Sequence, residues 1–229
     1  MVLVGTEQEV FLAKRAKAAK KRRSAKTATE SPARERILCA ALAAFIERGY
    51  AETSTLEIAT RARVSKRELY AHFSSKSAML TTAIAGRAAQ MRPPPELPEP
   101  SSRDALAALL VEFGKILLRE VSHPHVTAVF RLAISEAARS PEVARALHTA
   151  GREANRAALA GVVANAQAAG LLGAGDPAEL AQQFQALLWG DLMVVLLLRV
   201  AEPPSTQEIE RRARRAAAAF LELHPVAPG

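Results

Sequence analysis

The proline-rich stretch RPPPELPEPSS, residues 92–102, divides this 229-residue chain into two parts with different helical patterns. Proline at this density removes backbone N–H donors and fixes φ, so the stretch cannot be helical and is predicted to form an extended or disordered linker loop. Apolar residues recur every three or four positions on both sides, in short runs before it and in long runs after it. The chain is therefore predicted to be all-α, with about nine helices and no strand.

Four of these helices precede the proline-rich stretch, and each has a recognisable start. Ser and Thr side chains accept hydrogen bonds from the first free N–H groups of a helix, and proline suits the first helical position. Gly49 is predicted to end the first helix, because glycine readily takes the left-handed conformation found there. The predicted helices run from Ser31-Pro32 to Gly49, from Thr53-Ser54 to about Ala62, from Ser65 to about His72, and from Ser74 or Ser75 to about Met91.

Five longer helices follow, and Pro, Gly and capping residues mark their ends. They are predicted at about 103–122, 124–139, 141–169, 176–200 and 205–223. Hydrophobic residues make up 49% of the chain and aromatic residues only 4%, and alanine is abundant. This composition favours helices over sheets and is sufficient for a core.

The excess positive charge lies in the first third of the chain. Residues 1–31 carry a net charge of +5 and residues 32–77 carry +3, whereas residues 78–229 are neutral, for a total of +8. Residues 11–29 hold eight basic and no acidic residues, so residues 1–31 are predicted to be a disordered basic arm. The arm has three interpretations: a solvated tail, an arm that contacts DNA phosphates, or a membrane-surface helix, whose alanine-rich face would insert weakly. The asymmetry indicates a polyanionic partner for the N-terminal part.

Cysteine usage and apolar runs argue against secreted and membrane classes. The one cysteine, Cys39, excludes a disulfide within the chain and is expected to be a small packed residue, with a redox sensor as the lesser alternative. The most apolar run, 187–200, is shorter than the ~20 residues of a membrane helix and contains Asp191. The apolar start at residues 1–4 is too short for a signal peptide. We expect a cytoplasmic protein without a membrane partner.

No cluster of residues predicts catalysis. The five histidines are scattered, and no glycine-rich phosphate loop is present in the sequence. His123 and His125 flank Pro124 without a nearby cysteine or carboxylate, which is a poor spacing for a metal. We predict that the protein is not an enzyme, with no catalytic residue, no metal site and no cofactor.

The second and third helices, joined by about three residues, predict a helix-turn-helix, whose second helix would lie in the major groove of DNA. Residues 34–80 resemble the DNA-binding domain of the TetR/AcrR family of bacterial transcription regulators. The matching features are Ile37, Ala41, Phe45, Gly49-Tyr50, Thr53-Ser54, Ile58-Ala59, Val64-Ser65, Leu69-Tyr70, His72-Phe73 and Lys76. Beyond the proline-rich stretch, FRLAISEAARSPEVARAL, GDPAEL and FLELH are similar to the AefR-like branch of that family.

The resemblance implies a DNA-binding domain over residues 32–77. It implies that Lys66, Arg67 and Tyr70, with Ser65, face the major groove, and that Val64, Leu69 and Phe73 pack inward. The residues implied to hold the phosphate backbone are Thr53, Ser54, His72 and Lys76. Structural alternatives remain open: a half-buried ring for Tyr70, a favourable helix-dipole position for His72, and a solvated side chain for Lys76.

Arg63 departs from the family pattern, because relatives usually have glycine at this position in the turn. If the turn is left-handed there, an arginine is strained by about 1 kcal/mol or more; otherwise the turn has a different shape. Arg63 is also a candidate for an additional phosphate contact.

The resemblance further implies that residues 78–229 form a helical domain that dimerises and binds a small molecule. The predicted helix is apolar nearly all round over residues 184–200, and the 205–223 helix has a small-residue face. Helices 176–200 and 205–223 are therefore the predicted homodimer interface. That face consists of Ala213, Ala216, Ala217 and Phe220. The alternative is that both helices pack within a monomeric core.

A pocket for the small molecule would lie among the helices between residues 103 and 200. The candidate lining residues are Phe113, Phe130, Arg131, Trp189 and Met193. Aromatic and methionine side chains at helical spacing are more often ordinary core. Arg131 and Glu136 share a mostly apolar helix, and solvated salt-bridge partners are favoured for them over buried polar anchors.

Together these observations predict a sequence-specific DNA-binding transcriptional regulator. The family resemblance implies a homodimer on a palindromic operator, acting as a repressor that a small-molecule effector releases. The alternative is a non-specific nucleic-acid or anionic-surface binding protein that uses the basic arm.

Overall fold

The computed structural model describes residues 32–91 and 100–226, and every regular element in these ranges is a helix. The predicted all-α class is confirmed. The elements are α2 (Pro32–Arg48), α3 (Thr55–Ala62), α4 (Lys66–His72), α5 (Lys76–Ala89), α6 (Arg103–Val121), α7 (Pro124–Glu136), α8 (Pro141–Ala146), the π-helix η1 (Leu147–Glu153), α9 (Ala154–Ala168), α10 (Pro177–Trp189), α11 (Leu192–Leu197) and α12 (Thr206–Leu223). The predicted basic arm and residues 92–99 of the predicted linker loop lie outside the described residues.

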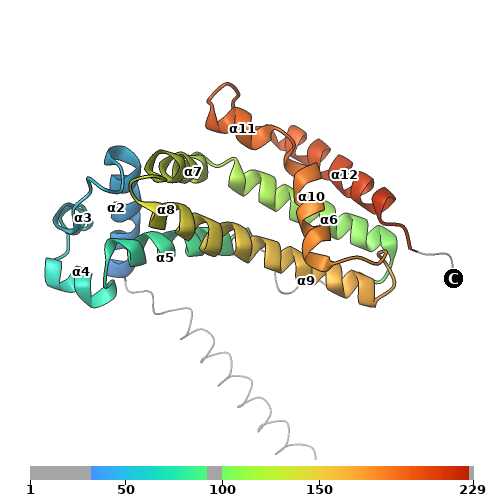
Figure 1. Ribbon diagram of the computed structural model, residues 1–229, viewed down its shortest axis with the longest axis horizontal. Helices are drawn as coiled ribbons and strands as arrows, with labels where there is room; N and C mark the ends of the chain where they lie inside the picture. The colour runs from blue at the N-terminus through green and yellow to red at the C-terminus, as the bar shows by residue number, and fades with distance from the viewer. Residues whose placement is uncertain (1–31, 92–99, 227–229) are drawn as a thin grey trace, which may run out of the picture.

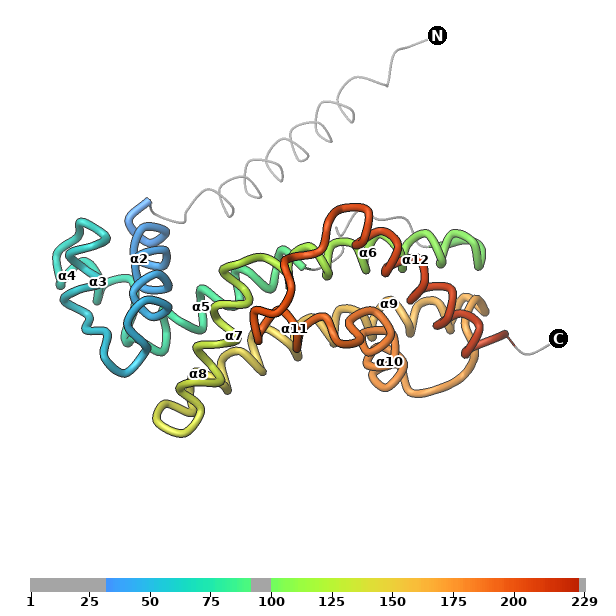
Figure 2. The backbone as a smooth tube through the Cα atoms, turned by 90° about the horizontal axis from the view of Figure 1, so that it is seen from above, coloured from blue at the N-terminus to red at the C-terminus, as the bar shows by residue number. Residues whose placement is uncertain are grey.

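The molecule is elongated, with α2, α3 and α4 at one end (Figure 1). Helices α6, α9, α10 and α12 form the other end, and α5, α7 and α8 lie between the two. Seen from above, α3 and α4 are the outermost helices of their end (Figure 2). In the described ranges, no helix combines the length and apolarity that crossing a membrane requires.

Serine side chains start helices α3, α4 and α5. Ser54, Ser65 and Ser75 each accept a hydrogen bond from the backbone N–H three residues further on, at 3.0–3.1 Å. Such a cap satisfies one of the N–H groups that a helix leaves free at its start. The capping serines predicted from the sequence are confirmed, with Ser75 rather than Ser74 preceding α5.

The helices around the turn share one apolar cluster with the middle of the molecule. Phe45 of α2, Ile58 of α3 and Leu69 of α4 are buried in it, and Val129 of α7 and Val143 of α8 belong to the same cluster. Burial of apolar surface stabilises such a cluster by roughly 25 cal/mol per Å². The packing therefore joins α2–α4 to α7 and α8 through a common core.

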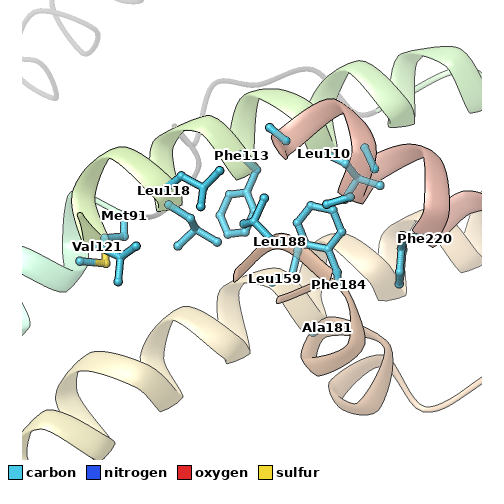
Figure 3. Close-up of a cluster of buried hydrophobic side chains, with 14 of the residues drawn as sticks. Met91, Leu110, Phe113, Leu118, Val121, Leu159, Ala181, Phe184, Leu188 and Phe220 are labelled. Carbon is cyan, nitrogen blue, oxygen red and sulfur yellow. The ribbon is translucent and has the colours of Figure 1, made fainter. Parts of the chain in front are cut away.

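A second apolar cluster fills the space between α6, α9, α10 and α12 (Figure 3). Phe113 of α6 projects toward α9 and α10, where Leu159 and Leu188 surround it, and Phe184 meets Phe220 edge-to-face at 5.5 Å. Ala213, Ala216, Ala217 and Phe220 of α12 are all buried in this cluster. The prediction that this small-residue face forms the dimer interface is therefore wrong: close-packed helices of the same chain cover it.

The predicted helix at 176–200 is two helices, because the chain turns sharply at Gly190. Gly190 has φ 48° and ψ −123°, a combination that side chains with a Cβ rarely adopt. Helix α11 follows in a new direction and buries Leu192 and Leu196 against the second cluster. The predicted 141–169 helix is also modified, since its middle turn, η1, is π-helical.

Candidate DNA-binding surface and internal cavity

The turn between α3 and α4 closes through the backbone of Arg63. This residue has φ 54° and ψ 47°, the left-handed conformation. Its N–H donates to the Thr60 carbonyl at 3.2 Å, and the Val64 N–H donates to the Ala59 carbonyl at 3.0 Å. These two bonds form the Schellman motif that commonly ends a helix at a glycine. The turn therefore keeps the shape that glycine would favour, and Arg63 adopts it with a strain of about 1–2 kcal/mol.

The outward face of α4 carries Lys66, Arg67 and Tyr70. Tyr70 is 46% exposed, its hydroxyl shares a hydrogen bond of 3.2 Å with the Thr55 hydroxyl, and the Lys66 ammonium lies 6.0 Å from its ring centroid. On the opposite face, Leu69 is fully buried and fixes the helix against α2 and α3. The first turn of α4 thus presents polar and aromatic groups to solvent from a rigid support.

The cations on this face of α4 and on the turn before it differ from nearby arginines in having no carboxylate partner among the described residues. Arg48 and Arg61 form salt bridges with Glu57 at 3.1 and 2.8 Å. Arg63, Lys66 and Arg67 are exposed and make no salt bridge to any residue of 32–91 or 100–226. Three cations within five positions therefore remain free to meet an external anion such as a phosphate.

Two of the residues predicted to hold phosphate are used inside the protein instead. Thr53 is 1% exposed, and its hydroxyl donates to the carbonyls of Gly49 at 2.7 Å and Ala44 at 3.2 Å. The Lys76 ammonium donates to the carbonyls of Tyr50, Ala51 and Thr53 at 2.8–3.2 Å and lies 4.7 Å from the Tyr50 ring centroid. Because an ammonium has three N–H donors, Lys76 has none left. Both side chains hold the loop between α2 and α3 and leave the set that faces DNA.

The other two predicted phosphate residues stay near the surface. Ser54 is exposed at the start of α3, where its hydroxyl caps the helix. His72 is half-buried at the end of α4, with its ring 6.5 Å from that of Phe73. DNA contact by these two residues, and by Ser65, stays a prediction.

A cavity of about 630 Å³ lies between α2, α5, α6, α7, η1, α9 and α10. Most of its lining is apolar, including Leu38, Ile84, Val121 and Val129. Its volume is in the range of sites for drug-sized molecules. Because α2 lines the cavity and packs against α3 and α4, one helix links the cavity to the helix-turn-helix.

The structure places two of the five predicted pocket residues in this lining, Phe130 and Trp189. Phe113 is 0% exposed in the second cluster (Figure 3). Met193 of α11 is buried in the same cluster. Arg131 donates hydrogen bonds to the carbonyls of Leu196 and Leu197, at 2.7 and 3.1 Å, and so fixes the end of α11. These three residues have structural roles, and the prediction that they line the pocket is wrong.

Several lining residues were not predicted. Cys39 is exposed and lines the cavity from α2, so the expectation that it is a packed core residue is wrong. Arg152, Asn155 and Arg156 line it from η1 and α9. Their spacing of three and four residues places them on one helix face. This spacing is visible in the sequence as a polar stripe on the predicted 141–169 helix.

Glu136 connects α7 to the loop after α2. Its carboxylate is 6% exposed and accepts a hydrogen bond of 3.1 Å from the Tyr50 N–H. Gly49 is needed beside it, because a Cβ at this position would lie 2.8 Å from the carboxylate oxygen and φ is +92°. Glu136 is therefore a buried polar anchor, and the half-buried Arg131 holds backbone carbonyls rather than a carboxylate. The favoured interpretation of both as solvated ion-pair partners is wrong.

Comparisons with known proteins agree with this arrangement. Residues 37–83 match the model described as bacterial regulatory proteins, tetR family, and residues 108–224 match the AefR-like transcriptional repressor C-terminal domain. A search of curated proteins finds no match.

Solved structures with the same fold cover nearly the whole described chain. The flavonoid-responsive regulator FrrA is 30% identical, with 86% of this chain and 98% of that chain covered and a TM-score of 0.70. A TetR transcriptional regulator from Agrobacterium tumefaciens is 28% identical, with 86% and 96% covered and a TM-score of 0.72. A TetR-family regulator from Pseudomonas syringae pv. tomato is 28% identical, with 87% and 99% covered and a TM-score of 0.65. The chain thus belongs to the TetR family of DNA-binding transcriptional regulators.

Proposed function

We propose that the protein is a sequence-specific repressor whose homodimer binds a palindromic operator and is released by a small-molecule effector. The observation that carries this proposal is the shared wall of the cavity. Helix α2 contributes Leu38 and Leu42 to the cavity on one face and buries Phe45 in the helix-turn-helix cluster. A molecule that fills the cavity would therefore press on the element that positions α3 and α4.

Helix α7 gives this coupling a second route. Val126, Val129 and Phe130 of α7 line the cavity, while Glu136 at the end of the same helix holds the Tyr50 N–H. Movement of α7 on ligand binding would therefore change the support of the loop before α3. The name of the flavonoid-responsive regulator FrrA supports a response to small molecules in a protein of this fold.

The proposed dimer uses the outward sides of α10 and α11. Leu187, Val194, Leu198 and Val200 are exposed apolar side chains on or just after α10 and α11. Such side chains are suited to a partner's surface, because their burial removes apolar area from water. Two protomers joined there would each present an α4, which suits two half-sites about one DNA turn, ~34 Å, apart.

In this proposal, α4 supplies the residues that distinguish bases. Arg67 and Lys66 can donate to guanine, and the Tyr70 hydroxyl lies beside them on the same exposed face. Arg63 adds a phosphate contact from the turn. The basic arm adds sequence-independent phosphate contacts, so deletion of residues 1–30 should weaken binding to all sequences about equally.

Selection of bound sites from a random pool of DNA tests the proposal. Wild-type protein should enrich a palindrome, and a variant with Lys66→Gln and Tyr70→Phe should lose that enrichment. Enrichment of no common sequence would instead support the alternative of non-specific binding through the basic arm, in which both substitutions leave binding unchanged.

A further inference from the structure

The cavity has a largely apolar part and a polar end, although α2, α5 and α7 also contribute the polar side chains of Glu35, Arg87 and His125. The apolar part consists mainly of Leu38, Leu42, Ile84, Val126, Val129 and Phe130 from α2, α5 and α7. The polar end combines Arg152, Asn155 and Arg156 of η1 and α9 with Gln185 and Trp189 of α10. An amphipathic molecule would match this division.

The polar end holds groups that lack partners within the protein. Asn155 is 7% exposed, and its amide nitrogen lies 3.1 Å from the Met91 sulfur while its oxygen has no partner among the described residues. The Trp189 indole N–H, the Arg156 Nε–H and the Arg87 Nε–H are also buried without a partner there. An unpaired buried polar group is unfavourable by about 1–3 kcal/mol. These four atoms have almost no accessible surface, so the cavity does not present them to a ligand.

Charge pairing then distinguishes Arg152 from its neighbours. Arg87 is paired with Glu120 at 2.8 Å, and Arg156 with Glu153 at 3.4 Å. Arg152 has no carboxylate partner in the described part of the chain, and its guanidinium carbon lies 5.9 Å from the Trp189 ring centroid. The indole face attracts the guanidinium and helps to hold it there. The planar fork of arginine then suits a carboxylate in two-point contact.

The position of Arg152 is also suited to a charged ligand group. Arg152 is exposed, so an anion bound to it would keep part of its hydration, and the large penalty for burying a lone charge is avoided. Among the described residues that line the cavity, Glu35 is the one carboxylate, and it belongs to α2, on the apolar side. The π-helical geometry of η1, which is rare and often found at functional sites, falls on the segment that carries Arg152.

We propose that the effector is an amphipathic organic acid. Its apolar body lies between α2, α5 and α7, and its carboxylate binds Arg152 beside Trp189. That this molecule acts as an effector rests on the proposed function, but its binding to the protein can be tested without DNA.

Trp189 makes the test direct, because it is the one tryptophan of the chain and lines the cavity. Decanoic acid and phenylbutyric acid, each compared with its primary amide, are suitable probes that do not absorb where tryptophan emits. Full-length protein is titrated with each probe, and binding is followed by Trp189 emission and by calorimetry. Each acid should bind at least about tenfold more tightly than its amide, as expected for hydrogen bonds to a charged group.

Arg152→Gln should remove the preference for the acid while leaving the amide affinity unchanged. Arg145→Gln is the matched control, since Arg145 is exposed on α8 and does not line the cavity. Equal affinity of acid and amide for the wild-type protein, a preference that survives in Arg152→Gln, or no binding of either acid would each overturn the inference.

Measuring DNA binding as well as acid binding shows whether the ligand assignment or the proposed function has failed. If the selected operator is bound but acids and amides behave alike, the ligand assignment fails and the function stands. If the acids bind through Arg152 and no operator is selected, the function fails and the ligand assignment stands. When both are correct, the acids release the operator, and Arg152→Gln needs about tenfold more acid for release.

Discussion

The two cationic regions of this protein differ in what surrounds their charges. At the turn and the start of α4, Arg63, Lys66 and Arg67 are exposed and unpaired in the described structure. At the cavity, Arg87 and Arg156 are paired with carboxylates, whereas Arg152 has no carboxylate partner among residues 32–91 and 100–226. An open surface with several free cations suits a polyanion that makes many interchangeable contacts, whereas a single positioned guanidinium suits one anionic group of defined geometry.

A change in salt concentration should give the largest difference between the two regions, measured as the loss of binding affinity at each. Raising NaCl from about 50 to about 200 mM should weaken operator binding by about a thousandfold, because a dimer presents six of these free cations and each phosphate contact releases counterions. Binding of decanoic acid, with one ion pair, should change by less than about tenfold. Anisotropy of labelled operator and Trp189 emission measure the two affinities. A parallel loss of both affinities would mean that the two regions do not differ in this way.

Removal of charge from α4 should have the next largest effect. The double variant Lys66→Gln, Arg67→Gln should bind the operator at least about a hundredfold more weakly, because each lost base or phosphate contact is worth about 1–3 kcal/mol. Its affinity for decanoic acid should match that of the wild type. Anisotropy with the selected operator checks this, with Arg145→Gln as the control. Operator affinity within twofold of the wild type would remove α4 from the DNA contact.

Lys76 tests a cation that the protein uses internally. Lys76→Met should lower the free energy of unfolding by about 1–3 kcal/mol, since three carbonyls lose a charged donor. The salt dependence of operator binding should stay unchanged, because Lys76 makes no phosphate contact in this interpretation. Urea denaturation measures the first quantity and salt titration the second. Unchanged stability with a smaller salt slope would return Lys76 to the phosphate-binding set.

Arg63→Gly should produce the smallest effect on stability. It releases about 1 kcal/mol of left-handed strain, part of which is offset by the greater chain entropy of glycine. The free energy of unfolding should therefore rise by less than about 1 kcal/mol. The salt slope of operator binding should fall by about one for each protomer, because one phosphate contact is lost. A rise in stability with the slope unchanged would show that Arg63 contributes strain alone.

The parts of the fold that local chemistry determines could be predicted from the sequence. The serine caps depend on residues three positions apart. The short link between α3 and α4 was also predicted, but the left-handed conformation at Arg63 was one of two alternatives, and the structure decides between them. The break at Gly190 was not predicted, because many helices tolerate a single glycine in an apolar run. There the burial of Leu192 and Leu196 by other helices favours the turn.

The cavity was harder to predict, since its lining comes from seven helices spread between residues 35 and 189. Phe113 and Phe130 look alike in the sequence, but α9, α10 and α12 fill the space around Phe113, whereas Phe130 borders open space. The prediction for Cys39 failed because one face of α2 lines the cavity and another packs into the apolar cluster around α3 and α4. Segments far away in the sequence decide which face of a helix is covered, and the periodicity of one helix does not show where those segments pack.

The π-helix η1 has a consequence for how this pocket could change over evolution. A π turn accommodates one residue more than an α turn, so losing one residue between positions 148 and 151 would leave an unbroken helix. The helices on its two sides would keep their relative orientation, because an α turn and a π turn each complete one revolution. The side chains within the turn would be redistributed around the helix axis. A change in chain length can therefore remodel the wall of the cavity around Arg152 while α8 and α9 stay aligned.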